Sequence, residues 1–520
     1  MGGAEPSGAR EGLDSVTRGT LVMLFGTLGY VVENFVSRVL LARSISIHDW
    51  GNFSLGLALA GLLASLGSLG LAQAVARNLP FASRDDERRA IVHSSFAVVV
   101  PSAIVVSGAM LFLGIALTPT LPELALTVEF FAGAVAMMIL SGLIAAVFQG
   151  YEDVRPNALF VQILNPTLFI VFLIAAEAPN PFHLGYLEAL LAYLASASVA
   201  LVAIALYARR RLPRLLPPGE RAPGVSRRLF LFAAPLFVVG VLGVVSQNGD
   251  TILLGVFLRN SLGYYTAALS LARLLMVGLG SLAYIFLPVT ARFVRAGDHD
   301  AVRITYATAT KWMILTSLPL FLIFFFLPSR SLGFVYGSEY AIGSTTLKLL
   351  VLAAFGSTLL GPSMATQVSY GQTRLLMYNT IAAALADVVL SWALIPPFGT
   401  NGAAVAWGVA TSMAPALSAV ELAVLQNVHP FRRNYLVPLL VTSVPLAVLF
   451  VFVPLAVPLW ALPLLVGGIA ILYLMLVFAT GSVDTGDRLL LEVVEGFLRR
   501  RIPFVRALAR WRLGDKVRDL

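Results

Sequence analysis

The chain has 520 residues, of which 58 % are hydrophobic and 12 % are charged, and its formal net charge is +9. A soluble domain carries about a quarter charged residues, so this composition, with a mean hydropathy of +0.86, excludes an ordinary soluble globular protein. The absence of cysteine excludes disulfides, thiolate metal sites and a cysteine nucleophile.

Residues 1–18 are polar and lack the apolar core of a secretory signal peptide, so we expect them to form a cytoplasmic N-terminal segment. Apolar windows of about 20 residues, which suffice to cross a bilayer, follow this segment. They predict an all-α polytopic membrane protein with about 14 transmembrane helices. In chain order, the expected spans are 19–42, 51–73, 91–117, 125–149, 157–177, 184–208, 229–257, 263–290, 306–327, 342–368, 375–396, 402–427, 434–455 and 457–480.

The distribution of arginine and lysine supports this count and sets an orientation. With the N-terminus in the cytoplasm, 30 of the 36 basic residues fall on the cytoplasmic side, as the positive-inside rule requires. We therefore expect a multi-pass protein of the cell (plasma) membrane with both termini in the cytoplasm. The remaining basic residues are Arg43, Arg259, Arg330 and Lys348 outside, and Arg38 and Arg273 within spans.

An internal repeat divides the chain. The segment GNFSLGLALAGLL begins at Gly51 and GYYTAALSLARLL begins at Gly263, which places the two copies 263 − 51 = 212 residues apart. Duplicated multi-helix halves are common in transporters. We expect two six-helix lobes around a central cavity, at 19–208 and 229–427, joined by the basic cytoplasmic linker 209–228. Two additional helices at 428–480 and a basic amphipathic cytoplasmic tail at 481–520 follow, although a solvated tail fits the same residues.

Charged and polar side chains inside spans are costly and are therefore candidates for function. Subtracting the repeat offset from 250 gives 38, so the repeat places Asp250 opposite Arg38 and predicts that the two form a pair. Carboxylates in spans could bind a proton or Na⁺, or could simply make helix-packing hydrogen bonds. The coupling or cavity candidates are Asp250, Glu33, Asn34, Gln247 and Asp387, and Asn157, Gln162 and Asn165-Pro166 predict a broken, polar wall in the fifth span.

Four motifs in order resemble one family. They are LLARSISIHDWGNFSLGLA at 40–58, GDTILLGVFLRNSLGYYTAALSLARLL at 249–275, SYGQTRLLMYN at 369–379 and FGTNGAAVAWGVA at 398–410. The chain resembles a polysaccharide (oligosaccharide-lipid) flippase of the multidrug/oligosaccharidyl-lipid/polysaccharide (MOP) exporter superfamily. The resemblance covers about residues 15–430. Ser44-Ile45 stands where the family usually has Leu-Gly.

The resemblance implies a V-shaped pair of helix bundles and the transfer of a lipid-linked glycan between leaflets. The carrier would be a polyprenyl phosphate or pyrophosphate. Arginine offers a permanent, bidentate cation for such a group. The phosphate-binding candidates are Arg273, Arg38 and Arg77, with Arg273 first among them.

Other functions remain open or are disfavoured. A multidrug exporter or a lipid II flippase of the same superfamily is the alternative, although arginines within spans disfavour an exporter of cations. A membrane glycosyltransferase needs a catalytic carboxylate motif in a sizeable loop, and the linker 209–228 holds only Glu220. We therefore expect no enzyme, cofactor, metal site or nucleic-acid partner. The expected partners are the lipid-linked glycan, membrane lipids, H⁺ or Na⁺ as coupling ion, and glycan polymerase or glycosyltransferase machinery.

Overall fold

The computed structural model describes residues 29–82, 84–177, 185–215 and 225–430, together with residues 468 and 475. Helices and short turns make up all of these ranges, and no strand occurs in them. The expected spans at 434–455 and 457–480, the tail and the N-terminal segment lie outside the described residues. The all-α prediction is confirmed.

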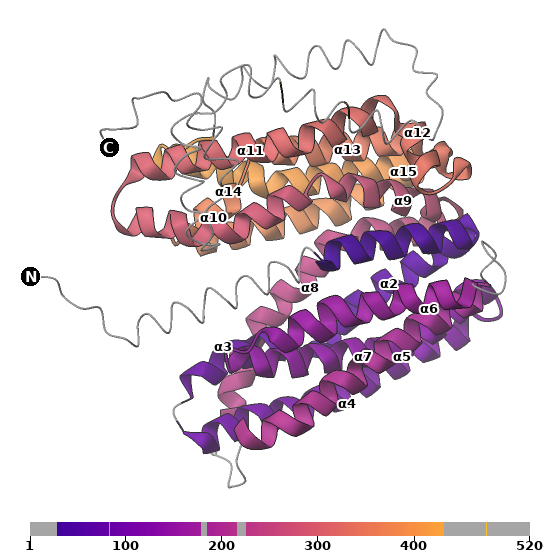
Figure 1. The fold of residues 1–520 in the computed structure, drawn as a ribbon, viewed down its shortest axis with the longest axis horizontal. Helices are drawn as coiled ribbons and strands as arrows, with labels where there is room; N and C mark the ends of the chain where they lie inside the picture. The colour runs from indigo at the N-terminus through magenta and orange to yellow at the C-terminus, as the bar shows by residue number, and fades with distance from the viewer. Residues whose placement is uncertain are drawn as a thin grey trace, which may run out of the picture. The chain divides into compact units, whose positions relative to one another are not determined.

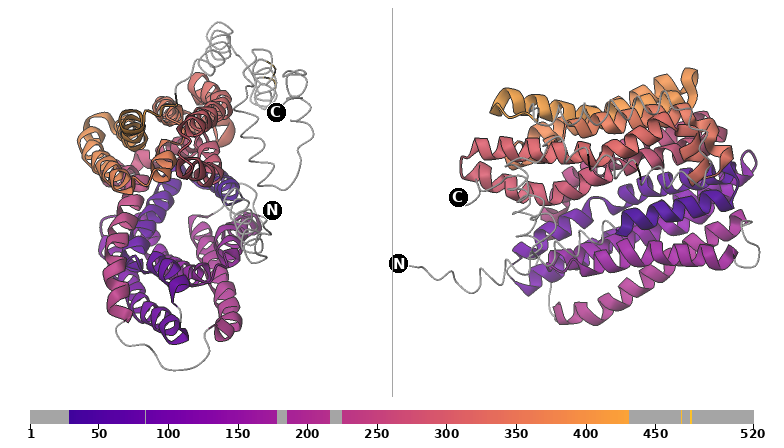
Figure 2. Two further views of the ribbon diagram at one scale, coloured as in Figure 1. Left: turned by 90° about the vertical axis from the view of Figure 1, so that its left-hand side faces the viewer. Right: turned by 45° about the horizontal axis from the view of Figure 1, so that its top comes forward.

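The helices fall into two compact units. The first unit contains residues 1–267 and 387–403, and the second contains residues 268–386 and 404–520. Within each unit the helices run side by side along its length (Figures 1 and 2). After a first helix at 29–44, the elements up to the start of the second unit are α2 (Ile47–Ser68), α3 (Leu71–Asn78), η1 (Leu79–Phe81), α4 (Asp85–Leu117), α5 (Pro122–Gly150), η2 (Asn157–Leu164), α6 (Asn165–Glu177), α7 (Tyr186–Leu215), α8 (Val225–Phe257) and η3 (Arg259–Ser261).

The following helix, α9, crosses from the first unit into the second. The long helix α15 carries a non-helical residue, Gly399, and its segment from Asp387 onward returns to the first unit until Ala403. The elements of this part are α9 (Leu262–Leu274), α10 (Val277–Arg295), α11 (His299–Phe326), α12 (Pro328–Val335), η4 (Ser338–Gly343), α13 (Ser344–Leu359), α14 (Ser363–Ser369) and α15 (Thr373–Gln426).

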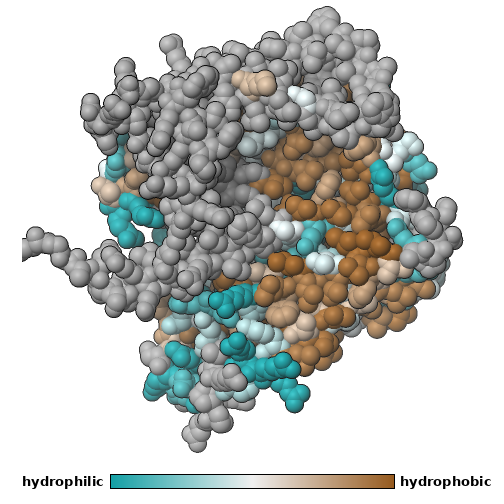
Figure 3. Space-filling model, viewed as in Figure 1, coloured by the Kyte–Doolittle hydropathy of each residue, from teal (hydrophilic) through white to brown (hydrophobic). Residues whose placement is uncertain are grey.

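The composition of these helices suits a bilayer. Among the described residues, 9 helical stretches are long and apolar enough to cross a membrane. In the space-filling view, apolar side chains dominate the part of the surface that is not grey, and hydrophilic ones gather in separate patches (Figure 3). Each expected span from the second to the twelfth falls on a helix or on a pair of helices separated by a break. The chain is therefore a polytopic membrane protein.

The second span is broken where it passes α8. Leu69 and Gly70 both have left-handed φ angles, 51° and 69°, and they separate α2 from α3. A Cβ atom on Gly70 would lie 2.5 Å from the Ala233 carbonyl oxygen and 2.6 Å from the Phe237 nitrogen. Glycine is required here for both reasons, because it tolerates the left-handed region and lets two backbones approach. The break turns α3 into a separate short helix.

The first glycines of the two repeated segments lie against each other. A Cβ atom on Gly51 would lie 3.0 Å from the Gly263 nitrogen, and one on Gly263 would lie 2.1 Å from the Ile47 carbonyl oxygen. Both glycines belong to the first unit. The starts of α2 and α9 therefore meet backbone to backbone, which only residues without a side chain permit.

An aromatic cluster holds the first unit together beside this contact. Phe53 of the repeat lies 5.2 Å from Phe131 of α5, 6.1 Å from Phe169 of α6 and 5.6 Å from Tyr193 of α7, measured between ring centroids. Aromatic pairs at such distances contribute about 0.5–1.5 kcal/mol beyond the burial of their area. This cluster fixes α5, α6 and α7 around α2, and so sets the walls that continue into the pocket described next.

Candidate functional site: a polar pocket and a buried carboxylate pair

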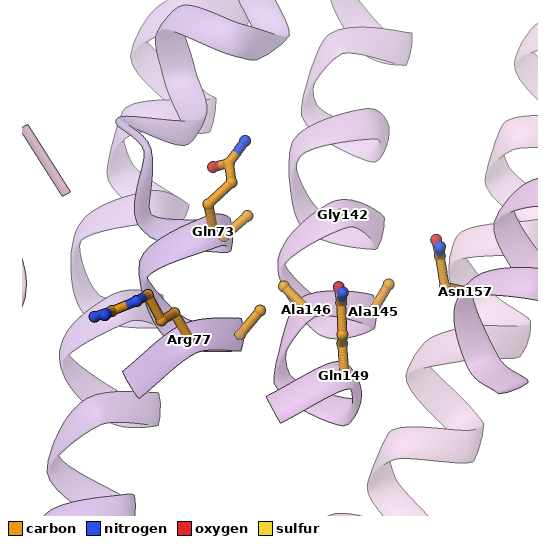
Figure 4. A pocket seen from close by; sticks show the side chains of 9 residues that line it. Gln73, Arg77, Gly142, Ala145, Ala146, Gln149 and Asn157 are labelled. Carbon is orange, nitrogen blue, oxygen red and sulfur yellow. The ribbon is translucent and has the colours of Figure 1, made fainter. Parts of the chain in front are cut away.

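A pocket of about 450 Å³ opens in the first unit between α3, α5 and the beginning of η2. Its polar lining consists of Gln73 and Arg77 from α3, Gln149 from the last turn of α5, and Asn157 from the first position of η2 (Figure 4). The rest of the lining is small: Ala72, Ala76, Gly142, Ala145 and Ala146. A Cβ atom on Gly142 would meet nothing within 4 Å, so this wall is open.

Local helix geometry brings these groups together. Gln73 and Arg77 are four residues apart on α3 and therefore share one face of that helix. The break at Leu69 and Gly70 sets the direction of this short helix. On the opposite side, residues Asn157–Leu164 form a π-helix, an irregularity that occurs frequently at functional sites. Polar side chains and irregular backbone are tolerated at membrane depth where they line a cavity.

Arg77 lies at the edge of this pocket. Its guanidinium carbon is 4.8 Å from the ring centroid of Phe232 on α8 and 6.0 Å from that of Phe81. The side chain points away from Gln149 and Asn157 (Figure 4). A cation–π contact at an exposed site is worth about 0.5–1 kcal/mol, which a stronger anionic partner would exceed. The guanidinium is exposed and can therefore turn toward a ligand.

A second polar site lies inside the first unit. Asp250 of α8 and Asp387 of α15 are both completely buried. The hydroxyl of Tyr265 donates a hydrogen bond to Asp250 Oδ2. A Cβ atom on Gly249 would lie 3.0 Å from Asp387 Oδ2, so the second carboxylate sits against the backbone next to the first. Ser391, one turn beyond Asp387, is also completely buried.

Asp387 and Ser391 have spare hydrogen-bonding capacity. Neither oxygen of Asp387, nor the Ser391 hydroxyl, has a hydrogen-bond partner of good geometry among the described residues. The Asp250 backbone and Ser391 are the polar groups nearest to Asp387, and the charge of Asp250 acts directly on it. Two like charges held so close in a buried place repel each other, and a proton or cation bound at Asp387 would reduce that repulsion. Carboxylate and hydroxyl oxygens are suitable ligands for a hard cation.

The other predicted residues lie apart from these two sites. Arg38 is half-buried in the first helix and lies near Tyr193 of α7. Glu33 lies against Thr167 of α6. The side-chain amide of Asn34 donates a 2.8 Å hydrogen bond to the Tyr30 carbonyl of its own helix. Gln247 is exposed on α8. Asp250 accepts a hydrogen bond from Tyr265 and lies close to Asp387, and its pairing with Arg38 stays a prediction.

Arg273 belongs to the second unit. It is half-buried in the last turn of α9, where its carbonyl accepts a 3.0 Å hydrogen bond from the Met276 nitrogen at the break before α10. Arg273 therefore lies next to a helix break, as Arg77 does on α3 in the first unit. Arg273 thus sits beside an irregular stretch of its own span.

Sequence reasoning missed several polar residues. Gln73 and Gln149 line the pocket but were not predicted, and the only available signal was the four-residue spacing of Gln73 and Arg77. A further network was missed in the second unit. There the side-chain amides of Asn379 and Gln367 both donate hydrogen bonds to Glu421 Oε2, the one from Asn379 being 2.8 Å long. The Ser418 hydroxyl donates a 2.8 Å hydrogen bond to Gln367 Oε1. Spacing along the sequence does not reveal a network built from three helical segments.

Comparisons with known proteins agree with this architecture. A family model described as "Polysaccharide biosynthesis protein" matches residues 16–294, and the MatE model matches residues 235–393. No curated protein sequence matches the chain. The fold is similar to a lipid II flippase MurJ in an inward closed conformation, with a TM-score of 0.66 at 14% identity, covering 87% of this chain and 97% of that one.

Two further solved structures share the fold. One is a MATE family multidrug resistance transporter of the MOP superfamily in an inward-facing conformation, with a TM-score of 0.61 at 15% identity, covering 79% of this chain and 99% of that one. The other is a MOP superfamily transporter from Pyrococcus furiosus, with a TM-score of 0.55 at 15% identity, covering 79% and 95% of the two chains. At these identities the likeness concerns the fold alone.

Proposed function

Because the chain belongs to the polysaccharide biosynthesis protein family, we propose that it is a flippase that moves a lipid-linked oligosaccharide from the inner to the outer leaflet of the cell membrane. The carrier in this proposal is a polyprenyl phosphate or pyrophosphate, and the exported glycan serves polysaccharide or glycoconjugate assembly. The chain has the fold of MOP superfamily transporters, and its long apolar helices suit a membrane carrier. Both features favour transport over catalysis.

The observation that carries this proposal is the pocket beside Arg77. An exposed guanidinium adjoins an open polar cavity in a protein whose helices are long and largely apolar. A phosphate bound there would gain charge-assisted hydrogen bonds from a planar, permanently charged fork. Arg38 and Arg273 remain candidates for later contacts with the phosphate, because each is a permanent cation within an apolar span.

The coupling ion in this proposal binds at the Asp250–Asp387 pair. The two carboxylates are buried and adjacent, and neither oxygen of Asp387 has a hydrogen-bond partner of good geometry among the described residues, so a proton or a Na⁺ ion would neutralise part of their repulsion. Occupancy by an ion changes the charge of a buried site where helices from distant parts of the sequence meet. Such a change can shift the balance between two conformations, which is how ion binding drives a secondary transporter.

A translocation assay tests the proposed function. Proteoliposomes would contain the purified protein and a polyprenyl-diphosphate oligosaccharide with a dithionite-sensitive fluorophore on the glycan. We expect the protein to expose the inner-leaflet label to external dithionite at least about tenfold faster than in protein-free liposomes, since a charged head crosses a bilayer core slowly. Transport of ethidium by the same liposomes, without movement of the glycan lipid, would instead favour a multidrug exporter.

The orientation is tested separately. We propose that the turn before Asp85 faces the cytoplasm together with both termini, because most basic residues then lie inside. Lys311, which is one of the 30 basic residues counted as cytoplasmic, is instead buried within α11. The chain has no cysteine, so single cysteines can be introduced without interference. Thr120→Cys should react with an impermeant maleimide on intact cells, whereas Asp300→Cys should react only after lysis. The reverse pattern would invert the topology.

A further inference from the structure

The pocket in the first unit has two chemically different sides. Gln73, Gln149 and Asn157 are neutral carboxamides, and each offers both donors and an acceptor. Arg77 is the single charged residue among those that line the pocket. An anionic group on the carboxamide side would need further arginine or lysine side chains, and a cationic ligand would need carboxylates. The residues that line the pocket supply neither. The lining matches a neutral group that both donates and accepts hydrogen bonds.

The carboxamides are available to a ligand. None of the three makes a hydrogen bond to another group in the described part of the chain, so their polar ends are unengaged there. Gln73 and Gln149 are exposed, and Asn157 is half-buried. The Arg77 guanidinium rests on Phe232, away from Gln149 and Asn157 (Figure 4). The charged and neutral sides are therefore separated within one cavity.

The small residues give the pocket room for a ring. Alanines line it on α3 and α5, and Gly142 leaves open space where a side chain would stand. A cavity of about 450 Å³ is within the usual range for small-molecule sites. Apolar methyl groups beside hydrogen-bonding amides suit a ring whose C–H faces are apolar and whose rim carries hydroxyl groups.

We propose that the side of the pocket formed by Gln73, Gln149 and Asn157 binds the hydroxyl-rich sugar ring that adjoins the lipid diphosphate, while Arg77 binds the diphosphate. This inference rests on the proposed function, and it assigns the recognition of the glycan to residues distinct from those that recognise the anion. The protein then distinguishes a sugar-loaded carrier from a bare one before transport.

Binding measurements on the purified full-length protein in nanodiscs test this division, with farnesyl diphosphate and farnesyl diphosphoglucose as probes. We expect Gln149→Leu and Asn157→Leu each to weaken binding of the glucose-bearing probe about fivefold, the effect of losing one or two neutral hydrogen bonds. The sugar-free probe should change less than about twofold. Arg77→Ala should weaken both probes, because it removes a charge-assisted contact to the shared diphosphate.

A steric variant gives an independent measurement. Gly142→Leu fills the open wall without altering a polar group, and it should weaken only the glucose-bearing probe. Gly108→Leu is the matched control, because Gly108 is also helical, is exposed and has open space around it. Equal losses for both probes in the amide variants would overturn the sugar assignment. If Arg77→Ala left both probes unchanged, the phosphate assignment of the proposed function would fail, while the ratio between probes would still decide the sugar assignment.

Discussion

Replacing Arg77 by alanine is expected to slow translocation of a polyprenyl-diphosphate oligosaccharide by about 10- to 100-fold. The loss follows from removing a hydrogen bond to a charged group, worth about 1.5–3 kcal/mol. The protein should remain folded, because the contact given up with Phe232 is an exposed cation–π interaction worth about 0.5–1 kcal/mol. Arg77→Lys should retain part of the rate, since it keeps the charge but loses the bidentate fork.

Arg84→Ala is the matched control for this experiment. Arg84 lies at the same end of the first unit, 69% of its side chain is exposed, and it pairs with Asp86 and Glu87 at the start of α4 instead of lining the pocket. Its loss should change the rate little, because exposed ion pairs contribute about 0–1 kcal/mol. Normal translocation by a well-expressed Arg77→Ala protein would remove Arg77 from the phosphate site and direct the same assay to Arg38→Ala and Arg273→Ala.

The helices were predictable because the bilayer leaves few alternatives. A segment that crosses the hydrocarbon core must satisfy its own backbone hydrogen bonds, so a long apolar window implies a helix. The repeat was also informative, since Gly51 and Gly263 match in sequence and meet in the structure. The polar wall predicted from Asn157 and Gln162 coincides with the π-helix. In each case a local pattern and a strong physical constraint pointed to the same feature.

The sites were less predictable because they depend on how helices pack. Gln73 and Gln149 are ordinary helix residues until the break at Leu69 and Gly70 turns α3 toward the end of α5. Leu69 gives no sequence signal for its left-handed φ. The closeness of Asp250 and Asp387 joins helices far apart in the chain, and no local pattern in the sequence relates these two positions. The pairing of Asp250 with Arg38, which the repeat offset suggests, stays a prediction.

Converting either carboxylate of the buried pair to its amide should abolish ion-driven translocation while leaving the protein folded. Asp387→Asn removes one of two adjacent buried charges, so the like-charge repulsion disappears and its thermal midpoint should be unchanged or higher. Asp250→Asn also changes the acceptor of the Tyr265 hydrogen bond, so its thermal midpoint is measured in parallel. Each amide also imitates a permanently neutralised carboxylate. We therefore expect an imposed proton or Na⁺ gradient to accelerate the native protein at least about tenfold more than either variant. Whichever gradient drives the native protein identifies the ion.

The double variant distinguishes one shared site from two separate ones. If Asp250 and Asp387 hold a single ion together, the double variant should be no slower than the worse single variant, because residues that act as a unit are not additive. Glu188→Gln is the control, since Glu188 is an exposed carboxylate of the first unit that accepts a 3.0 Å hydrogen bond from the Gly185 nitrogen. Single variants that keep a full response to the gradient would exclude the pair as the coupling site. Losses that multiply in the double variant would show two independent contributions instead of one bound ion.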